Sequence, residues 1–128
     1  MTFDPSGEAS PEEIQGRVDT LIEENELVLF MKGNKLMPQC GYSQKALDVL
    51  SQYYDSDEIV AEDVLSALDA YRTALEARSG WETIPQTFVD GEFIGGSDIL
   101  EELHQRGDLA DELGVDPEDV DDGLEAPF

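Results

Sequence analysis

Residues 27–31, Leu-Val-Leu-Phe-Met, form a run of five apolar residues with no polar position among them. A strand with one face in water alternates apolar and polar residues, so this unbroken run predicts a strand that is buried on both faces. Strands of this kind lie inside parallel or mixed sheets that helices cover on both sides. The run therefore favours the α/β class of folds.

The rest of the chain alternates helical and extended patterns. The patterns predict, in order, a helix over 11–24 after Ser10-Pro11, the strand over 27–31, a helix from 41 to about 54, a strand within 58–64, a helix over 65–78, a hairpin of 86–89 and 92–94 around Asp90-Gly91, a helix from an N-cap at Ser97-Asp98 to about 105, and a short helix over 108–113. This order fits a central four-stranded mixed sheet flanked by helices.

The charge balance is extreme, with 31 acidic residues against seven basic ones and a formal net charge of −24. Ten of the acids lie in residues 1–13 and 114–128, which leaves the body of the chain at about −14. Self-repulsion of this size is weakened when salt at about 1 M shortens the Debye length to about 3 Å. We interpret the composition as adaptation to a salty cytoplasm, in preference to an acidic protein of ordinary surroundings.

The same composition bounds the organisation of the chain and its partners. We expect a flexible N-terminal segment over 1–10, one folded domain over 11–113 and an acidic tail over 114–128 with little to bury. A polyanion is a poor match for nucleic acid or an anionic membrane surface. The first residues resemble no export signal, and no stretch is long enough to span a membrane, so we expect a cytoplasmic location.

Cys40 is the single cysteine of the chain, and it lies where a loop ends and the helical pattern from Gly41 begins. Unpaired N–H groups and the helix dipole at such a position favour the thiolate. One cysteine excludes an internal disulfide and a metal site made of several thiolates of one chain, but it leaves open a site shared between molecules. The alternative is an inert, buried thiol.

Several separate segments surround this cysteine in sequence order. They are Lys32-Gly33, residues 38–43 (Pro-Gln-Cys-Gly-Tyr-Ser), Trp81, residues 83–86 (Thr-Ile-Pro-Gln), residues 90–96 (Asp-Gly-Glu-Phe-Ile-Gly-Gly) and Asp98. Together they resemble the monothiol glutaredoxins, whose signature is Cys-Gly-Phe-Ser, over about residues 14–113. The resemblance implies a thioredoxin-like (glutaredoxin) fold, binding of glutathione, and a [2Fe-2S] cluster held between two subunits for transfer to apo iron-sulfur proteins.

The resemblance also implies roles for particular residues. Cys40 would be both the reactive thiol and the cluster ligand. The binding site for glutathione or a related small thiol would consist of Lys32, Arg72, Thr83, Ile84, Pro85, Gly96, Ser97 and Asp98. Lys32 would pair with a carboxylate of glutathione, and Arg72 would serve the other end of the tripeptide. Ile84 before a cis Pro85 would offer its backbone to the cysteinyl unit. Ser97 and Asp98, at the start of a helix, would hold the glutamyl carboxylate and amine.

Cluster chemistry agrees with these roles. A [2Fe-2S] centre is normally held by four thiolates, and this chain has one. Two subunits and two small thiols supply the four. An anionic peptide also needs cations in a body that is otherwise repellent, and Lys32 and Arg72 are two of only seven bases.

Each assignment has a plainer alternative. Lys32 is then an ordinary solvated base, and Arg72 pairs with Glu76 one helical turn away. Pro85 is then trans, as most prolines are. The glycines before Ser97 then form only a tight turn, with Ser97 as a helix cap.

Two further residues are expected to lie outside the chemistry. Trp81 is expected to pack beside the site, and His104 is expected to be structural or on the surface.

At the level of function, two alternatives to cluster transfer remain. One is a thiol-disulfide oxidoreductase that removes glutathione from proteins, of weak activity because Ser43 replaces a resolving cysteine. The other is a redox- or iron-sensing regulatory module.

Overall fold

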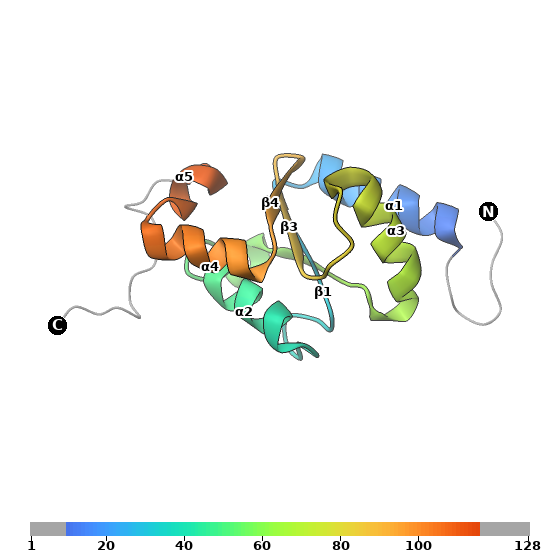
Figure 1. Ribbon diagram of the computed structural model, residues 1–128, viewed down its shortest axis with the longest axis horizontal. Helices are drawn as coiled ribbons and strands as arrows, with labels where there is room; N and C mark the ends of the chain where they lie inside the picture. Colours follow the sequence, from blue (N-terminus) through green and yellow to red (C-terminus); the bar gives the residue numbers. More distant parts are fainter. Residues whose placement is uncertain (1–9, 116–128) are drawn as a thin grey trace.

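The computed structural model describes residues 10–115, which form one mixed sheet covered by helices (Figure 1). The strand order is β2-β1-β3-β4. Strand β1 (Leu27–Met31) pairs in parallel with β2 (Val60–Asp63) and antiparallel with β3 (Gln86–Val89), which pairs antiparallel with β4 (Glu92–Gly95). All five residues of β1 are buried. The predicted α/β fold with a four-stranded mixed sheet is confirmed.

Helices cover both faces of this sheet. Helices α1 (Pro11–Glu24) and α3 (Leu68–Ser79) pack together on one face, and α2 (Gly41–Leu50) and α4 (Ser97–Arg106) pack together on the other (Figure 1). The short helix α5 (Leu109–Leu113) follows α4 and adds to the second layer.

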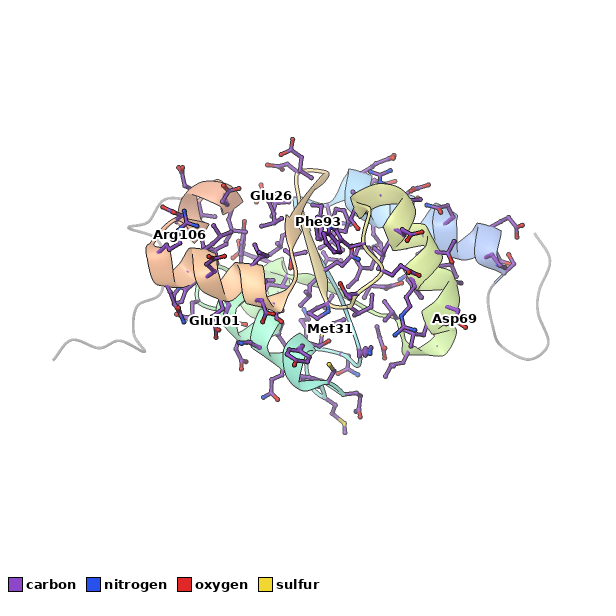
Figure 2. All side chains as sticks on the ribbon, in the orientation of Figure 1. Glu26, Met31, Asp69, Phe93, Glu101 and Arg106 are labelled. Carbon is purple, nitrogen blue, oxygen red and sulfur yellow. The ribbon has the colours of Figure 1, made fainter. Side chains whose placement is uncertain are left out.

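Alternate side chains of β1 divide the core into two clusters, because successive side chains of a strand point to opposite faces. Leu27, Leu29 and Met31 pack under α2 and α4. Val28 and Phe30 pack under α1 and α3, where Phe30 meets Phe88 edge to face at 5.8 Å between ring centroids. Figure 2 shows Met31 in the interior, whereas Arg106 lies on the outer side of α4.

Local signals set most of the element ends. Ser10 accepts a hydrogen bond from the backbone N–H of Glu13 at 3.2 Å, so it caps α1 as expected. The hairpin turn at Asp90 and Gly91 has φ of +50° and +85°, which the Asp-Gly pair tolerates. Within residues 10–115 no helix has the length and apolar character that a membrane crossing requires.

Three predicted boundaries were wrong. Helix α2 ends at Leu50 rather than near 54: the Ser51 hydroxyl donates to the Leu47 carbonyl, and the N–H groups of Gln52 and Tyr53 donate three residues back instead of four. Helix α3 begins at Leu68 because a 3-10 turn, Leu65–Ala67, comes first. The N-cap of α4 is Gly96, whose carbonyl accepts from Leu100 N–H, so Ser97 is the first helical residue and not a cap.

Two predictions concern residues that the structure describes only at their edges. The flexible segment over 1–10 and the acidic tail over 114–128 lie outside the described residues, except for Ser10, Gly114 and Val115. Ser10 caps α1, Gly114 ends α5, and Val115 packs against the core under α4.

Candidate functional site

Cys40 is the N-cap residue of α2 and is half-buried. The loop before it folds back on itself, with a bridge between Gly33 and Pro38 and a 2.9 Å hydrogen bond from Gln39 N–H to the Lys32 carbonyl. Gly33 permits this turn, since its φ is +89° and a Cβ there would lie 2.5 Å from the Gln39 nitrogen. The loop therefore brings Cys40 close to Lys32.

The surroundings of Cys40 favour its thiolate. Burial alone would raise the pKa of the thiol, but the backbone N–H groups of Ser43 and Tyr42, the Ser43 hydroxyl and the charge of Lys32 together hold the pKa below its ordinary value. Ser43 is fully buried, and its Oγ also accepts a 3.0 Å hydrogen bond from the Lys32 N–H. A sulfur in this setting can act as a nucleophile or as a metal ligand.

A groove of about 410 Å³ opens beside this cysteine. The residues that line it are Lys32, Tyr42, Arg72, Thr83, Ile84, Pro85, Gly96, Ser97, Asp98 and Ile99. All eight residues expected to bind a small thiol are among them. Cys40 is not, but it lies two residues before Tyr42.

The backbone around Pro85 shapes the floor of the groove. The Ile84-Pro85 peptide bond is cis, as the resemblance implied. A Cβ added at Gly96 would lie 3.1 Å from the Pro85 carbonyl oxygen, so the start of α4 approaches this loop closely. Gln86 is buried and donates to the carbonyls of Trp81 at 2.7 Å and Thr83 at 3.0 Å, which fixes the loop.

Positive charge gathers at the groove and is paired off elsewhere. Within residues 10–115, Lys32 makes no ion pair with a carboxylate. Arg72 has only a 3.8 Å contact with the exposed Asp69, and not the pair with Glu76 that was the alternative to ligand binding. The bases far from the groove, Arg17, Arg78 and Arg106, each pair with a carboxylate. The groove thus keeps cations available for an anion.

The groove lining also includes an acidic group, Asp98. The Asp98 side chain is 84% exposed, and its nearest base is Lys45 at 3.9 Å. Lys45 pairs more closely with Glu101, at 3.0 Å, which fixes the start of α2 to α4. The groove can therefore receive a molecule that carries carboxylates at one end and an amine at the other.

Sequence reasoning missed several residues of this region. It left out Ile99 and Tyr42 as lining residues, and it assigned no role to Lys45 or Gln86. Ile99 could have been found from its place one residue after Asp98 in the same helical turn. Gln86 had a weaker signal, a polar residue at the start of a strand that is otherwise buried.

Trp81 and His104, which were expected to take no part in the chemistry, do not line the groove. Trp81 is 61% exposed rather than packed. His104 contacts the Tyr53 hydroxyl through Nδ1 at 2.5 Å, between α4 and the end of α2, which agrees with the expected structural place.

Exposed apolar side chains also gather at this end of the molecule. Leu36 is 92% exposed and Met37 is 64% exposed, both in the loop before Cys40. Asn34 holds this tip by accepting hydrogen bonds from both of their N–H groups, and Lys35 donates to the carbonyls of residues 56 and 59. The loop thus presents two apolar side chains in a fixed conformation.

A four-stranded mixed sheet with helices on both faces, a cysteine at the first turn of α2 and a cis proline beside it define a thioredoxin-like protein. Residues 27–94 match the family model described as glutaredoxin. A monothiol glutaredoxin ycf64-like protein of Synechocystis is 44% identical over 103 residues, which is 80% of this chain and 94% of that protein. The chain therefore belongs to the glutaredoxin family, and this relative within it is monothiol.

Solved structures agree in fold. The reduced apo form of poplar GrxS14 superposes with a TM-score of 0.67 at 34% identity and covers 79% of this chain and 90% of that one. A buckwheat glutaredoxin-glutathione complex superposes with a TM-score of 0.65 at 25% identity and covers 82% of this chain and 94% of that one.

Proposed function

We propose that this glutaredoxin binds glutathione or a related γ-glutamyl thiol in its groove and uses it to carry a [2Fe-2S] cluster to apo iron-sulfur proteins. The observation that carries the proposal is the Cys40 thiol, whose pKa is lowered, beside a groove whose bases, Lys32 and Arg72, have no close carboxylate partner among residues 10–115. The buckwheat relative, which was crystallised with glutathione, supports the choice of ligand.

The proposed ligand fits the groove by charge and backbone. Lys32 and Arg72 face its carboxylates, and the backbone at Ile84, before the cis proline, pairs with its cysteinyl unit. The first turn of α4 offers free N–H groups to the glutamyl carboxylate at Ser97, while Asp98 receives the amine. In this proposed arrangement the sulfur of the ligand faces Cys40.

The cluster, as cargo, requires a second copy of the chain. Within residues 10–115 no group of three or more His, Cys, Asp and Glu side chains could hold a metal ion. Cys40 supplies one thiolate of the four that a [2Fe-2S] centre normally takes. Two chains and two bound thiols complete the set, and the proposed homodimer therefore exists when loaded.

The surface around Cys40 suits such a dimer. Leu36, Met37 and Tyr42 are exposed apolar side chains at this end, and burying them between two chains would be favourable. Two copies that each carry −24 repel one another, so we further propose that assembly needs the high salt of a halophile's cytoplasm.

The experiment is anaerobic reconstitution with iron, sulfide and either glutathione or γ-glutamylcysteine, in about 1 M salt. We expect a coloured dimer from the wild type and a colourless monomer from Cys40→Ser, which changes one atom. Omission of the small thiol should also prevent colour. A coloured Cys40→Ser protein would exclude the proposal.

A second function is favoured by the lowered pKa of Cys40. The thiolate would attack the glutathionyl sulfur of a modified protein, release that protein's thiolate and keep glutathione as a mixed disulfide. A second glutathione would then release Cys40 and leave as oxidised glutathione. Turnover of a glutathionylated substrate distinguishes the two, since fast turnover by a protein that takes up no cluster would favour the oxidoreductase.

A further inference from the structure

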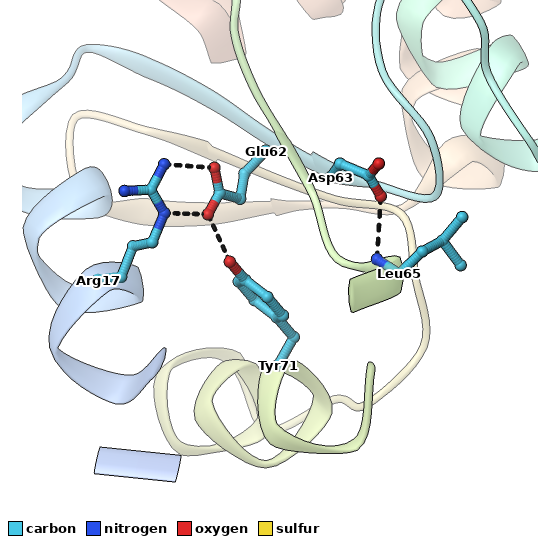
Figure 3. Close-up of polar contacts among 5 residues, drawn as sticks. All are labelled: Arg17, Glu62, Asp63, Leu65 and Tyr71. Carbon is cyan, nitrogen blue, oxygen red and sulfur yellow. Dashed lines mark hydrogen bonds and ion pairs between the residues drawn. The ribbon is translucent and has the colours of Figure 1, made fainter. Parts of the chain in front are cut away.

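An ionic cluster on the α1 and α3 side of the sheet has a buried carboxylate, Glu62, a buried phenol, Tyr71, and an exposed guanidinium, Arg17 (Figure 3). The guanidinium of Arg17 donates to both carboxylate oxygens of Glu62, through Nη2 to Oε1 at 2.8 Å and through Nε to Oε2. The Tyr71 hydroxyl donates to the same Oε2. Glu62 is 8% exposed and Tyr71 is 3% exposed. The cluster joins α1, β2 and α3 through one carboxylate.

Stability alone gives little reason for such a cluster. Its neighbours in the core are apolar, among them Phe30, which pairs with Glu62 across β1 and β2. The side chain of Arg17 is 57% exposed, and an ion pair that is open to solvent on one side adds little to stability. Directional bonds differ from apolar contacts in that they fix the relative orientation of the elements they join.

On α3 and on β2, the residue that follows a cluster member is connected to the groove. Arg72 follows Tyr71 on α3 and lines the groove. Asp63 follows Glu62 on β2, and its Oδ1 accepts hydrogen bonds from Gly33 N–H at 3.1 Å and Leu65 N–H at 2.9 Å. The first of these bonds holds the turn directly after Lys32. Both groove cations are therefore linked to the cluster. Arg72 is the neighbour of Tyr71, and Lys32 is the neighbour of Gly33, which bonds to Asp63 beside Glu62.

We propose that the Arg17–Glu62–Tyr71 cluster is a positioning device that holds Arg72, and with it the Lys32–Gly33 turn, at the spacing an anionic ligand of the groove requires. The inference rests on the proposed small-thiol site. The three residues touch no ligand themselves and act through the orientation of α3 and β2.

The test is a double-mutant cycle on ligand retention, with oxidised glutathione as the probe. The Cys40 thiolate attacks one sulfur of the probe, forms a Cys40-glutathione disulfide and releases one reduced glutathione. The equilibrium constant of this exchange, read by intact mass in glutathione redox buffers, reports how well the groove holds the tripeptide. Tyr71→Phe removes one hydrogen bond and leaves the packing of the ring.

We expect Tyr71→Phe to lower this constant about two- to tenfold, as the loss of one hydrogen bond implies. Arg72→Ala should lower it too, and Tyr71→Phe should cost less in the Arg72→Ala background than in the wild type, because part of the effect of the cluster passes through Arg72. The pH midpoint of Cys40 alkylation should not move. Additive effects, or no effect of Tyr71→Phe, would overturn the proposal.

The matched control is Arg78→Ala. Arg78 also ties α3 to α1, through Asp19 at 3.3 Å and Glu23 at 3.1 Å, but it does not line the groove. We expect this variant to lose some stability and to retain the exchange constant. An equal fall of the exchange constant in Arg78→Ala would contradict the proposal, because the cluster would then only support the fold in general. If Arg72→Ala itself has no effect, the small-thiol site fails and this inference fails with it.

Discussion

Replacing Gly33 with alanine should disrupt the loop that delivers Cys40. At φ of +89° an alanine has a left-handed backbone, which costs about 1–2 kcal/mol. Its Cβ would also lie 2.5 Å from the Gln39 nitrogen and 2.5 Å from the Met37 carbonyl oxygen, both of which are backbone atoms that cannot rotate away. Overpacking of this kind costs about 1–3 kcal/mol more. We expect Gly33→Ala to lose about 2–5 kcal/mol in total, a large share of the roughly 5–15 kcal/mol that stabilises a typical domain.

Gly80 provides a matched control, because its φ is +83° and a Cβ there meets no atom within 4 Å. Gly80→Ala should therefore lose only the backbone cost, about 1–2 kcal/mol. Urea unfolding at constant salt measures both free energies. Alkylation of Cys40 should change rate only in Gly33→Ala, since Gln39 adjoins the cysteine. Equal losses in the two variants would refute the account of this loop.

Two further predictions concern titrating groups. Ser43→Ala should raise the pKa of Cys40, because it removes the hydroxyl that stabilises the thiolate, and should shift the pH profile of iodoacetamide alkylation upward; an unchanged midpoint would contradict the role of Ser43. Burial and the nearby carboxylates of Glu26, Asp90 and Glu58 raise the pKa of Tyr54 to about 12, above its ordinary value of 10. A phenol with a raised folded pKa contributes stability that is present below pH 10 and is lost as the pH rises toward 12. Tyr54→Phe should thus weaken the alkaline loss of stability seen in urea titrations, and an identical pH dependence in both proteins would contradict the assignment.

The sequence predicted the layers of this fold well, because they follow from local patterns. The apolar run at 27–31 is the central strand, and the Asp-Gly pair forms the expected turn. The ends of helices were less predictable where a side chain competes with the backbone. The Ser51 hydroxyl bonds to the Leu47 carbonyl where α2 ends, and the Asp63 carboxylate accepts from Leu65 N–H at the start of the 3-10 turn before α3. Neither event leaves a periodic signal in the sequence.

The sequence brought the proposed binding residues to one groove, but it did not reveal which charged groups pair with one another. The resemblance named eight of the ten residues that line the groove, and all of these except Arg72, which lies on α3, belong to loops or element ends near Cys40. The partner of Arg72 is Asp69 rather than Glu76, and rotamers decide such a choice. The Arg17–Glu62–Tyr71 cluster joins residues 45 and nine positions apart, so no local pattern reveals it.

Native mass spectrometry of the anaerobically reconstituted protein tests the central claim most directly. The account predicts a mass of two chains, one [2Fe-2S] unit and two small thiols, which falls to the mass of bare single chains in Cys40→Ser. Iron and sulfide retained by a single chain, or by the Cys40→Ser variant, would contradict it.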